Sequence, residues 1–92
     1  DSLTNEYVVI ENQLSTTDHD HIGKLFTYSA SFGATTLIWI AERLRDEHRQ
    51  AIDWFNDITT ENIDFYGIEM ELFQIGNSDF APHLKIVSKH FI

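Results

Sequence analysis

Apolar and polar positions along the chain repeat with two different periods, which predict alternating strands and helices. The run Glu6–Leu14 is rich in β-branched and aromatic residues and is typical of a strand. Its centre, Tyr7–Ile10, is apolar without alternation, which indicates a strand covered on both faces. The polar residues Glu11–Gln13 follow where a buried strand would continue with apolar residues. Such a break in the pattern is typical of a functional position.

A helical period follows this strand and predicts a helix over Asp18–Ser31. Thr17 with Asp20 three residues later resembles a capping box at its start, and Gly33 is placed as its C-terminal stop. The residues that share its core-facing stripe are Ile22, Leu25, Phe26 and Ser29. A second stripe is polar and is formed by His21, Lys24 and Tyr28.

The second half of the chain predicts a strand, a helix and a hairpin. Thr35–Ala41 is a buried strand, and with the preceding strand and helix it makes a right-handed βαβ unit with parallel strands. Asp46 is expected to cap a helix that continues through about Asn56. A longer, alternating strand covers Ile63–Ile75, and the turn Gly76–Asp79 leads to an antiparallel strand over Leu84–Phe91. The apolar side of the second helix is expected to consist of Ala51, Ile52, Trp54 and Phe55.

These elements follow in the order β-α-β-α-β-β, which predicts an α/β domain with a mixed sheet flanked by two helices. The 92 residues allow one small domain, whose expected core includes Trp39, Trp54 and the seven phenylalanines. No apolar run approaches the roughly 20 residues of a membrane span, so we expect no membrane partner. The chain has no cysteine, which excludes a disulfide scaffold, a thiolate zinc site and a cysteine nucleophile, and which suits the cytoplasm.

The charge of the chain limits how it could bind nucleic acid. The 15 acidic residues outnumber the 6 lysines and arginines, and the formal net charge is -9. Phosphate affinity comes from clustered Lys and Arg, so this balance counts against binding through bulk charge. It leaves room for an enzyme that contacts nucleic acid with a few basic groups. Lys24 is the one basic residue expected to meet a phosphate near the Glu11 strand.

The polar strand end Glu11–Gln13, followed by a helix that carries Lys24–Tyr28, resembles the PD-(D/E)XK nuclease superfamily in its RecB-like branch. In that family an Asp ends one strand, Glu-x-Lys or Glu-x-Gln lies on the next strand of a hairpin, and the following helix carries Gln-x-x-x-Tyr. The resemblance implies a restriction-endonuclease-like core and metal-dependent hydrolysis of DNA or RNA phosphodiester bonds. The order of elements agrees along the whole chain, and the specific part is residues 8–28, which look like uncharacterised prokaryotic members.

The resemblance also implies a role for each matching residue. Glu11 and the main-chain carbonyl of Asn12 would bind Mg²⁺ or Mn²⁺, since such ions prefer oxygen ligands. Gln13 stands at the place of the motif lysine and would orient water or phosphate by hydrogen bonding alone. Lys24 stands where the helix motif has glutamine, so it would restore a cation near the phosphate, with Tyr28 as its helper.

The carboxylate that should precede Glu11 in the family pattern is missing. Asp1 lies ten residues earlier, but a hairpin turning around Leu3–Asn5 would pair it near Tyr7. We therefore expect residues 1–92 to be the C-terminal portion of a larger nuclease-like domain that lacks its N-terminal part. Such a fragment would be inactive by itself.

Other interpretations of the chain stay open at this point. The first is a non-catalytic module that binds nucleic acid or protein and keeps the nuclease fold, which the net charge and Gln13 favour. The second is an interaction domain, such as a homodimer formed through the edge strand Leu84–Phe91. The run Asp18–His21 does not predict a transition-metal cluster, because consecutive residues diverge around a helix.

Overall fold

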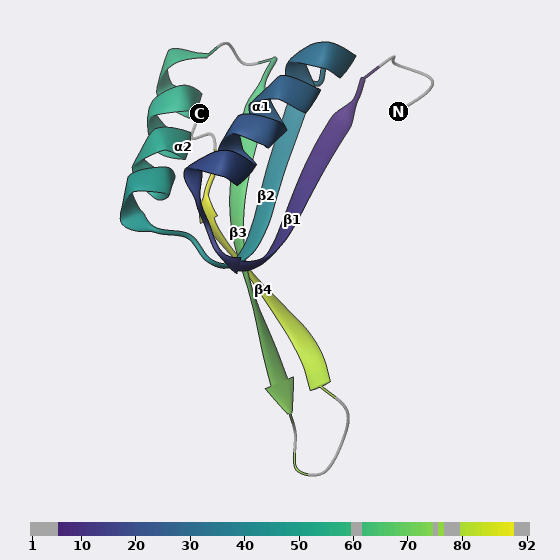
Figure 1. Cartoon of the computed structure of the whole chain (residues 1–92), viewed down its shortest axis with the longest axis vertical. Coiled ribbons are helices and arrows are strands. Elements are labelled where there is room, and N and C mark those ends of the chain that lie inside the picture. The colour runs from purple at the N-terminus through teal and green to yellow at the C-terminus, as the bar shows by residue number, and fades with distance from the viewer. Residues whose placement is uncertain (1–5, 60–61, 75, 77–79, 90–92) are drawn as a thin grey trace.

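The computed structural model of the chain describes residues 6–59, 62–74, 76 and 80–89 (Figure 1). The predicted order of elements is confirmed, with two helices and one four-stranded mixed sheet. The predicted hairpin turn at residues 3–5 lies outside the described residues. In chain order the elements are β1 (Val8–Thr16), α1 (His19–Phe32), β2 (Thr36–Arg43), α2 (Asp46–Ile58), β3 (Asp64–Gln74) and β4 (Phe80–Ser88).

The strands lie in the sheet in their chain order, β1-β2-β3-β4. The first three are parallel and β4 is antiparallel to β3, as predicted. Glu11 of β1 lies beside Trp39 of β2, which lies beside Gly67 of β3. Both helices connect neighbouring parallel strands in the same direction across the sheet, so they cover the same face (Figure 1).

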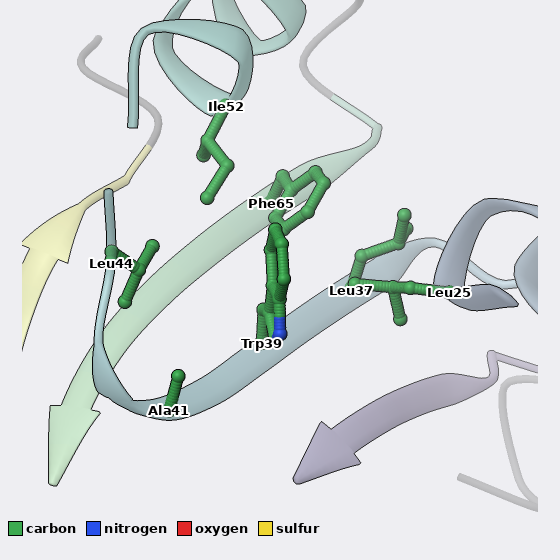
Figure 2. Close-up of a cluster of buried hydrophobic side chains, with 7 residues drawn as sticks. All are labelled: Leu25, Leu37, Trp39, Ala41, Leu44, Ile52 and Phe65. Carbon is green, nitrogen blue, oxygen red and sulfur yellow. The ribbon is translucent and has the colours of Figure 1, made fainter. Parts of the chain in front are cut away.

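The core fills the space between this face and the two helices (Figure 2). Trp39 of β2 and Phe65 of β3 are fully buried at its centre. The ring of Phe65 contacts Phe26 of α1 and Phe55 of α2, with ring centroids 5.6 and 5.7 Å apart. Helix α1 contributes the buried Leu25 and Ser29 of its predicted core-facing stripe. The buried apolar residues are Leu25, Leu37, Trp39, Ala41, Leu44, Ile52 and Phe65.

The opposite face of the sheet is open, which corrects the prediction that β1 is covered on both faces. Val8 and Ile10 of β1 are 52% and 56% exposed, and Leu84 and Ile86 of β4 are both 55% exposed. The prediction failed because a continuous apolar run does not show on which side each crossover helix lies. The half-buried apolar side chains that complete this face are Ile38, Ile40, Tyr66, Ile68 and Met70.

Several helix boundaries and core assignments also differ from expectation. The N-cap of α1 is Asp18, not Thr17, and its side chain accepts the main-chain N–H of His21. Helix α2 begins at Asp46 itself, after an N-cap at Arg45 without a side-chain bond. Trp54 of α2 is 62% exposed, since it lies on the side of the helix away from the sheet, and it is not a core residue. Gly33 is confirmed as the stop of α1, with a left-handed φ of 64° that favours glycine.

The final strand begins earlier than its prediction over Leu84–Phe91, of which residues 90 and 91 lie outside the described residues. Strand β4 already begins at Phe80 and ends at Ser88. Pro82 lies inside this strand, in register with Leu72 of β3. A proline is tolerated there because β4 is the last strand in the order, and its outer edge needs no ladder hydrogen bond. Within the described part of the chain, neither helix has the length and apolar content that a membrane span requires.

Candidate active site

The residues of the nuclease-like motif lie on the middle of β1 and on α1, and the strand does not end at Glu11–Gln13 as predicted but continues to Thr16. Glu11 and Gln13 project from β1 toward the helices, whereas Asn12 projects toward the open face. The Glu11 side chain is half-buried, Gln13 is 3% exposed and Asn12 is exposed. Further along the chain, the carboxyl ends of β1 and β2 meet the first turns of both helices, and this is where open α/β sheets bind ligands.

Gln13 is held by both ends of its amide group. Its Oε1 accepts the indole Nε1–H of Trp39 at 3.1 Å inside the core. Its Nε2 donates to the main-chain oxygen of Thr16 at 2.7 Å and to Oδ2 of Asp18 at 3.1 Å. These bonds explain why a polar residue interrupts the apolar strand at this position. The amide hydrogens of Gln13 are thus directed at protein acceptors, whereas its predicted role is to orient water or phosphate.

Asp18 joins this network to the first turn of α1. Its Oδ1 accepts the main-chain N–H of His21 at 2.8 Å and lies 2.7 Å from Nδ1 of the same histidine. The main-chain N–H of His21 is the main reason why the pKa of Asp18 is lowered, and the His21 side chain lowers it further. A carboxylate at this end is also favoured by the positive end of the helix dipole.

Glu11 lies beside the other side of the His21 ring. Glu11 Oε1 is 3.9 Å from His21 Nε2, and both side chains are largely shielded, with exposures of 22% and 29%. The ring of His21 therefore stands between two carboxylates, bonded to Asp18 and facing Glu11. Sequence reasoning placed His21 on the polar stripe of α1, with an approach to phosphate as its suggested role, and did not connect it to Glu11 or Asp18.

Lys24 and Tyr28 lie on the exposed side of α1. Lys24 Nζ forms an ion pair with Asp20 Oδ2 at 3.2 Å, and this bond is the main reason why its pKa is raised. Tyr28 is 48% exposed. Both side chains line a shallow depression that also includes His19, Asp20, Gly23 and Thr27. The structure therefore places the Lys24 ammonium beside Asp20, one helical turn from His21.

Arginines also approach this end of the sheet, which corrects the expectation that Lys24 alone lies close to the Glu11 strand. Arg43 of β2 lies in register with Thr16, the last residue of β1. Arg45 follows, and its Nε donates to the main-chain oxygen of Thr17 at 3.1 Å. Sequence reasoning missed them because parallel pairing brings the ends of strands that are far apart in sequence to one edge.

A second polar chain runs from the loop after β1 to α2, and it was not predicted. The fully buried Thr17 accepts the main-chain N–H of Arg45 at 2.9 Å, and its Oγ1 lies 2.7 Å from Nδ1 of the buried His48. His48 Nε2 in turn lies 2.7 Å from Nδ1 of His19. Burial is the main cause that lowers the pKa of His48, and the neighbouring His19 lowers it further. Its position four residues before Ile52, on the buried stripe of α2, was the available signal.

The oxygen atoms of Glu11 and Asn12 on β1 fit a hard divalent cation in part. Tyr7, just before β1, directs its carbonyl to the Thr36 N–H of β2, and directions alternate along a strand, so the Asn12 carbonyl faces the other edge. No described strand pairs with that edge. Glu11 and this carbonyl provide two oxygen ligands, and Mg²⁺ commonly takes one or two protein carboxylates and keeps its waters. The described residues contain no group of three or more His, Asp or Glu side chains placed to hold an ion.

Comparison with models of known families, with curated proteins and with solved structures finds no match to this chain.

Proposed function

We propose that this chain carries the metal-binding half of a nuclease site that hydrolyses phosphodiester bonds of DNA or RNA. The observation that supports it best is the place of Glu11. Its carboxylate projects from the middle of β1 toward the helices, next to the Asn12 carbonyl, which faces the edge that no described strand pairs with, and it lies 3.9 Å from His21. The carboxylate and the carbonyl are the acceptor types that a hard cation needs.

In this proposal each residue has a limited task. Glu11 and the Asn12 carbonyl hold Mg²⁺ or Mn²⁺, which when bound polarises a phosphate oxygen and makes an attacking water more acidic. Gln13 fixes the loop after β1 through its bonds to Thr16 and Asp18. Lys24 and Tyr28 provide a cation and a hydroxyl on the adjoining face of α1, where they would meet the phosphate chain.

The basic residues at this end support nucleic acid as the partner despite the net charge of -9. Arg43 is exposed at the end of β2, and Arg43 and Arg45 line one polar depression together with Thr16, Asp46 and Glu47. Arginine binds phosphate through two parallel N–H donors, so these two residues would provide a local phosphate contact at the carboxyl end of the sheet. With this function we propose a restriction-endonuclease-like core, and the cytoplasm as the place where it works.

The test is nicking of supercoiled plasmid by the full-length protein with Mg²⁺ or Mn²⁺, for wild type and Glu11→Ala. The matched control is Glu42→Ala, which removes an exposed carboxylate near the end of the neighbouring strand β2. The proposal predicts metal-dependent nicking that Glu11→Ala abolishes and Glu42→Ala preserves. Equal nicking by wild type and Glu11→Ala would show that Glu11 has no part in the reaction.

A non-catalytic binding module is the second candidate, and the Gln13 network favours it. A catalytic lysine at this position would provide charge, whereas the Gln13 amide is neutral and bonds Trp39, Thr16 and Asp18. Mn²⁺ titration separates the candidates. Nucleic-acid binding that persists in the full-length protein without saturable Mn²⁺ binding would select the module.

A further inference from the structure

The open face of the sheet carries rows of apolar side chains that cross neighbouring strands. In one row, Ile10 of β1 lies beside Ile38 of β2, which lies beside Tyr66 of β3. The apolar residues that continue this surface along β2, β3 and β4 are Ile40, Ile68, Ile86, Met70 and Leu84. Successive side chains of a strand point to opposite faces, so these residues lie on the side away from the buried Trp39 and Phe65. Together they form one apolar surface across all four strands.

Charged side chains lie at the ends of this face or on the other side of the sheet. Within the described strands, alternation places Glu42 and Asp64 on the open face. Asp64 begins β3 and Glu42 lies near the end of β2, so the described residues between them leave the centre of the face uncharged. The acidic residues of the two helices are Asp20, Asp46, Glu47, Asp53 and Asp57. Much of the net charge of -9 therefore lies on the helical side of the sheet, away from the open face (Figure 1).

The extent of the open face is sufficient for an interface. Neither helix of the described chain covers it, because both crossovers pack on the opposite side. Parallel strands are normally covered on both faces, and monomers seldom expose more than a few hundred Å² of contiguous apolar surface. Four strands about 4.8 Å apart, each about nine residues long at about 3.3 Å per residue, give a face of about 570 Å². Two such faces bury about 1,100 Å² when they meet, which is enough for a specific interface of the weaker kind.

We propose that a second copy of this chain covers the open face, so that the two sheets pack face to face in a symmetric dimer. A two-fold interface needs a surface that is complementary to itself, and an apolar centre with polar ends meets this need. Isoleucine side chains from two facing sheets can interdigitate when the sheets lie about 10 Å apart. The acidic helices of both copies then lie on the outer sides of the dimer, so the net charge of -9 does not prevent the contact.

Contact between the open faces is favoured over pairing along the outer edge of β4, which the sequence left open as a route to a homodimer. Pro82 of β4 has no N–H to donate, and the exposed Lys85 adds a charge to the same strand. Proline and lysine on an edge strand are features by which proteins prevent pairing with another chain. The proposed dimer therefore does not use this edge, and it does not depend on the proposed nuclease function.

The experiment is sedimentation equilibrium of the full-length protein at concentrations from about 5 to 500 µM, which span the range of a weak dimer. The variants are Ile10→Lys and Ile86→Lys, which each place a charge in the open face. The matched control is Ile58→Lys on α2, because Ile58 is 60% exposed, close to the 56% and 55% of the two face residues. Transfer of NMR magnetisation between isotopically labelled and unlabelled wild-type copies locates the contact directly, without a substitution that could affect folding.

Wild type should dimerise with a Kd of about 10–100 µM, and more tightly at high salt because salt screens the repulsion between two acidic chains. Each face variant should weaken the dimer by more than about 10-fold, since it buries an unpaired charge, whereas Ile58→Lys should change the Kd by less than about twofold. Magnetisation should pass between copies through the methyl groups of Ile40 and Ile68. A protein that stays monomeric throughout would overturn the proposal and assign the face to another segment or to a different protein. A dimer that both face variants leave unchanged would overturn it in favour of an edge strand.

Discussion

Replacing Gln13 with leucine should destabilise the fold far more than the loss of a polar side chain from a strand normally does. Leucine is close to glutamine in size, so the substitution leaves little empty space and mainly removes hydrogen bonds. The indole N–H of Trp39 loses its acceptor inside the core, which costs about 1–3 kcal/mol. The lost donation to the Thr16 carbonyl adds about 0.5–1.5 kcal/mol, while solvent can replace the bond to Asp18.

The expected free energy of unfolding is therefore about 2–4 kcal/mol lower for Gln13→Leu, as measured by urea unfolding at pH 7. Asn12→Ala, the exposed neighbour on the same strand, should remain within about 0.5 kcal/mol of wild type. A double-mutant cycle with Trp39→Phe isolates the buried bond, because the double variant lacks both of its partners. The double variant should lose about 1 kcal/mol less unfolding free energy than the sum of the losses in the two single variants. Additive costs, or a Gln13→Leu variant as stable as wild type, would refute the reasoning.

Three further outcomes can be measured by the same unfolding assay. Leu37→Ala, on the covered face, should lower the free energy of unfolding by about 2–5 kcal/mol. Ile10→Ala, on the open face, should lower it by about 1 kcal/mol or less. Similar losses for the two variants would contradict a core on one side of the sheet. Gly67→Ala should cost about 1–3 kcal/mol, because its new methyl group would lie 2.8 Å from a Leu44 methyl carbon inside the core. Since burial depresses the pKa of His48, its contribution to stability is complete above its unfolded value of 6.5 and is lost as the pH falls toward the folded pKa. Wild type should therefore lose stability below pH 6.5 more steeply than His48→Gln, and parallel pH profiles would exclude this role.

Local patterns in the sequence were sufficient to predict the order and type of the elements. The spacing of Leu25 and Ser29 identified the buried stripe of α1, because helical periodicity depends only on neighbours along the chain. Gly33 was identified as the stop because the left-handed conformation it adopts is a local property. The parallel pairing of β1 and β2 followed from the handedness of a strand-helix-strand unit.

Features that depend on contacts between distant segments were not predictable in this way. The open face of the sheet results from two crossovers on one side, and no single strand shows this in its pattern. Both tryptophans were predicted to be core residues because of their residue type. Trp39 is buried and Trp54 is exposed, because only Trp39 lies on the covered face. The role of Gln13 required knowledge that Trp39, 26 residues later, lies beside it.

The sequence indicated the segments that form the candidate site but not the contacts between them. The break at Glu11–Gln13 and the polar stripe of α1 were recognised as a site from the sequence. The approach of His21 to Glu11 depends on the angle at which α1 leaves β1, and the link from Thr17 to His48 depends on the packing of α2. Neither the direction of α1 nor the packing of α2 can be predicted from a local sequence pattern.

The most direct test of the central claim is the single-turnover rate of plasmid nicking by the full-length protein with Mn²⁺, compared between wild type and Glu11→Gln. This substitution keeps the size of the side chain and removes only the charge that holds the ion. Loss of even an outer-shell partner of a metal ligand costs 10- to 100-fold, so the account predicts a rate more than about 100-fold lower. Equal rates for the two proteins would contradict it.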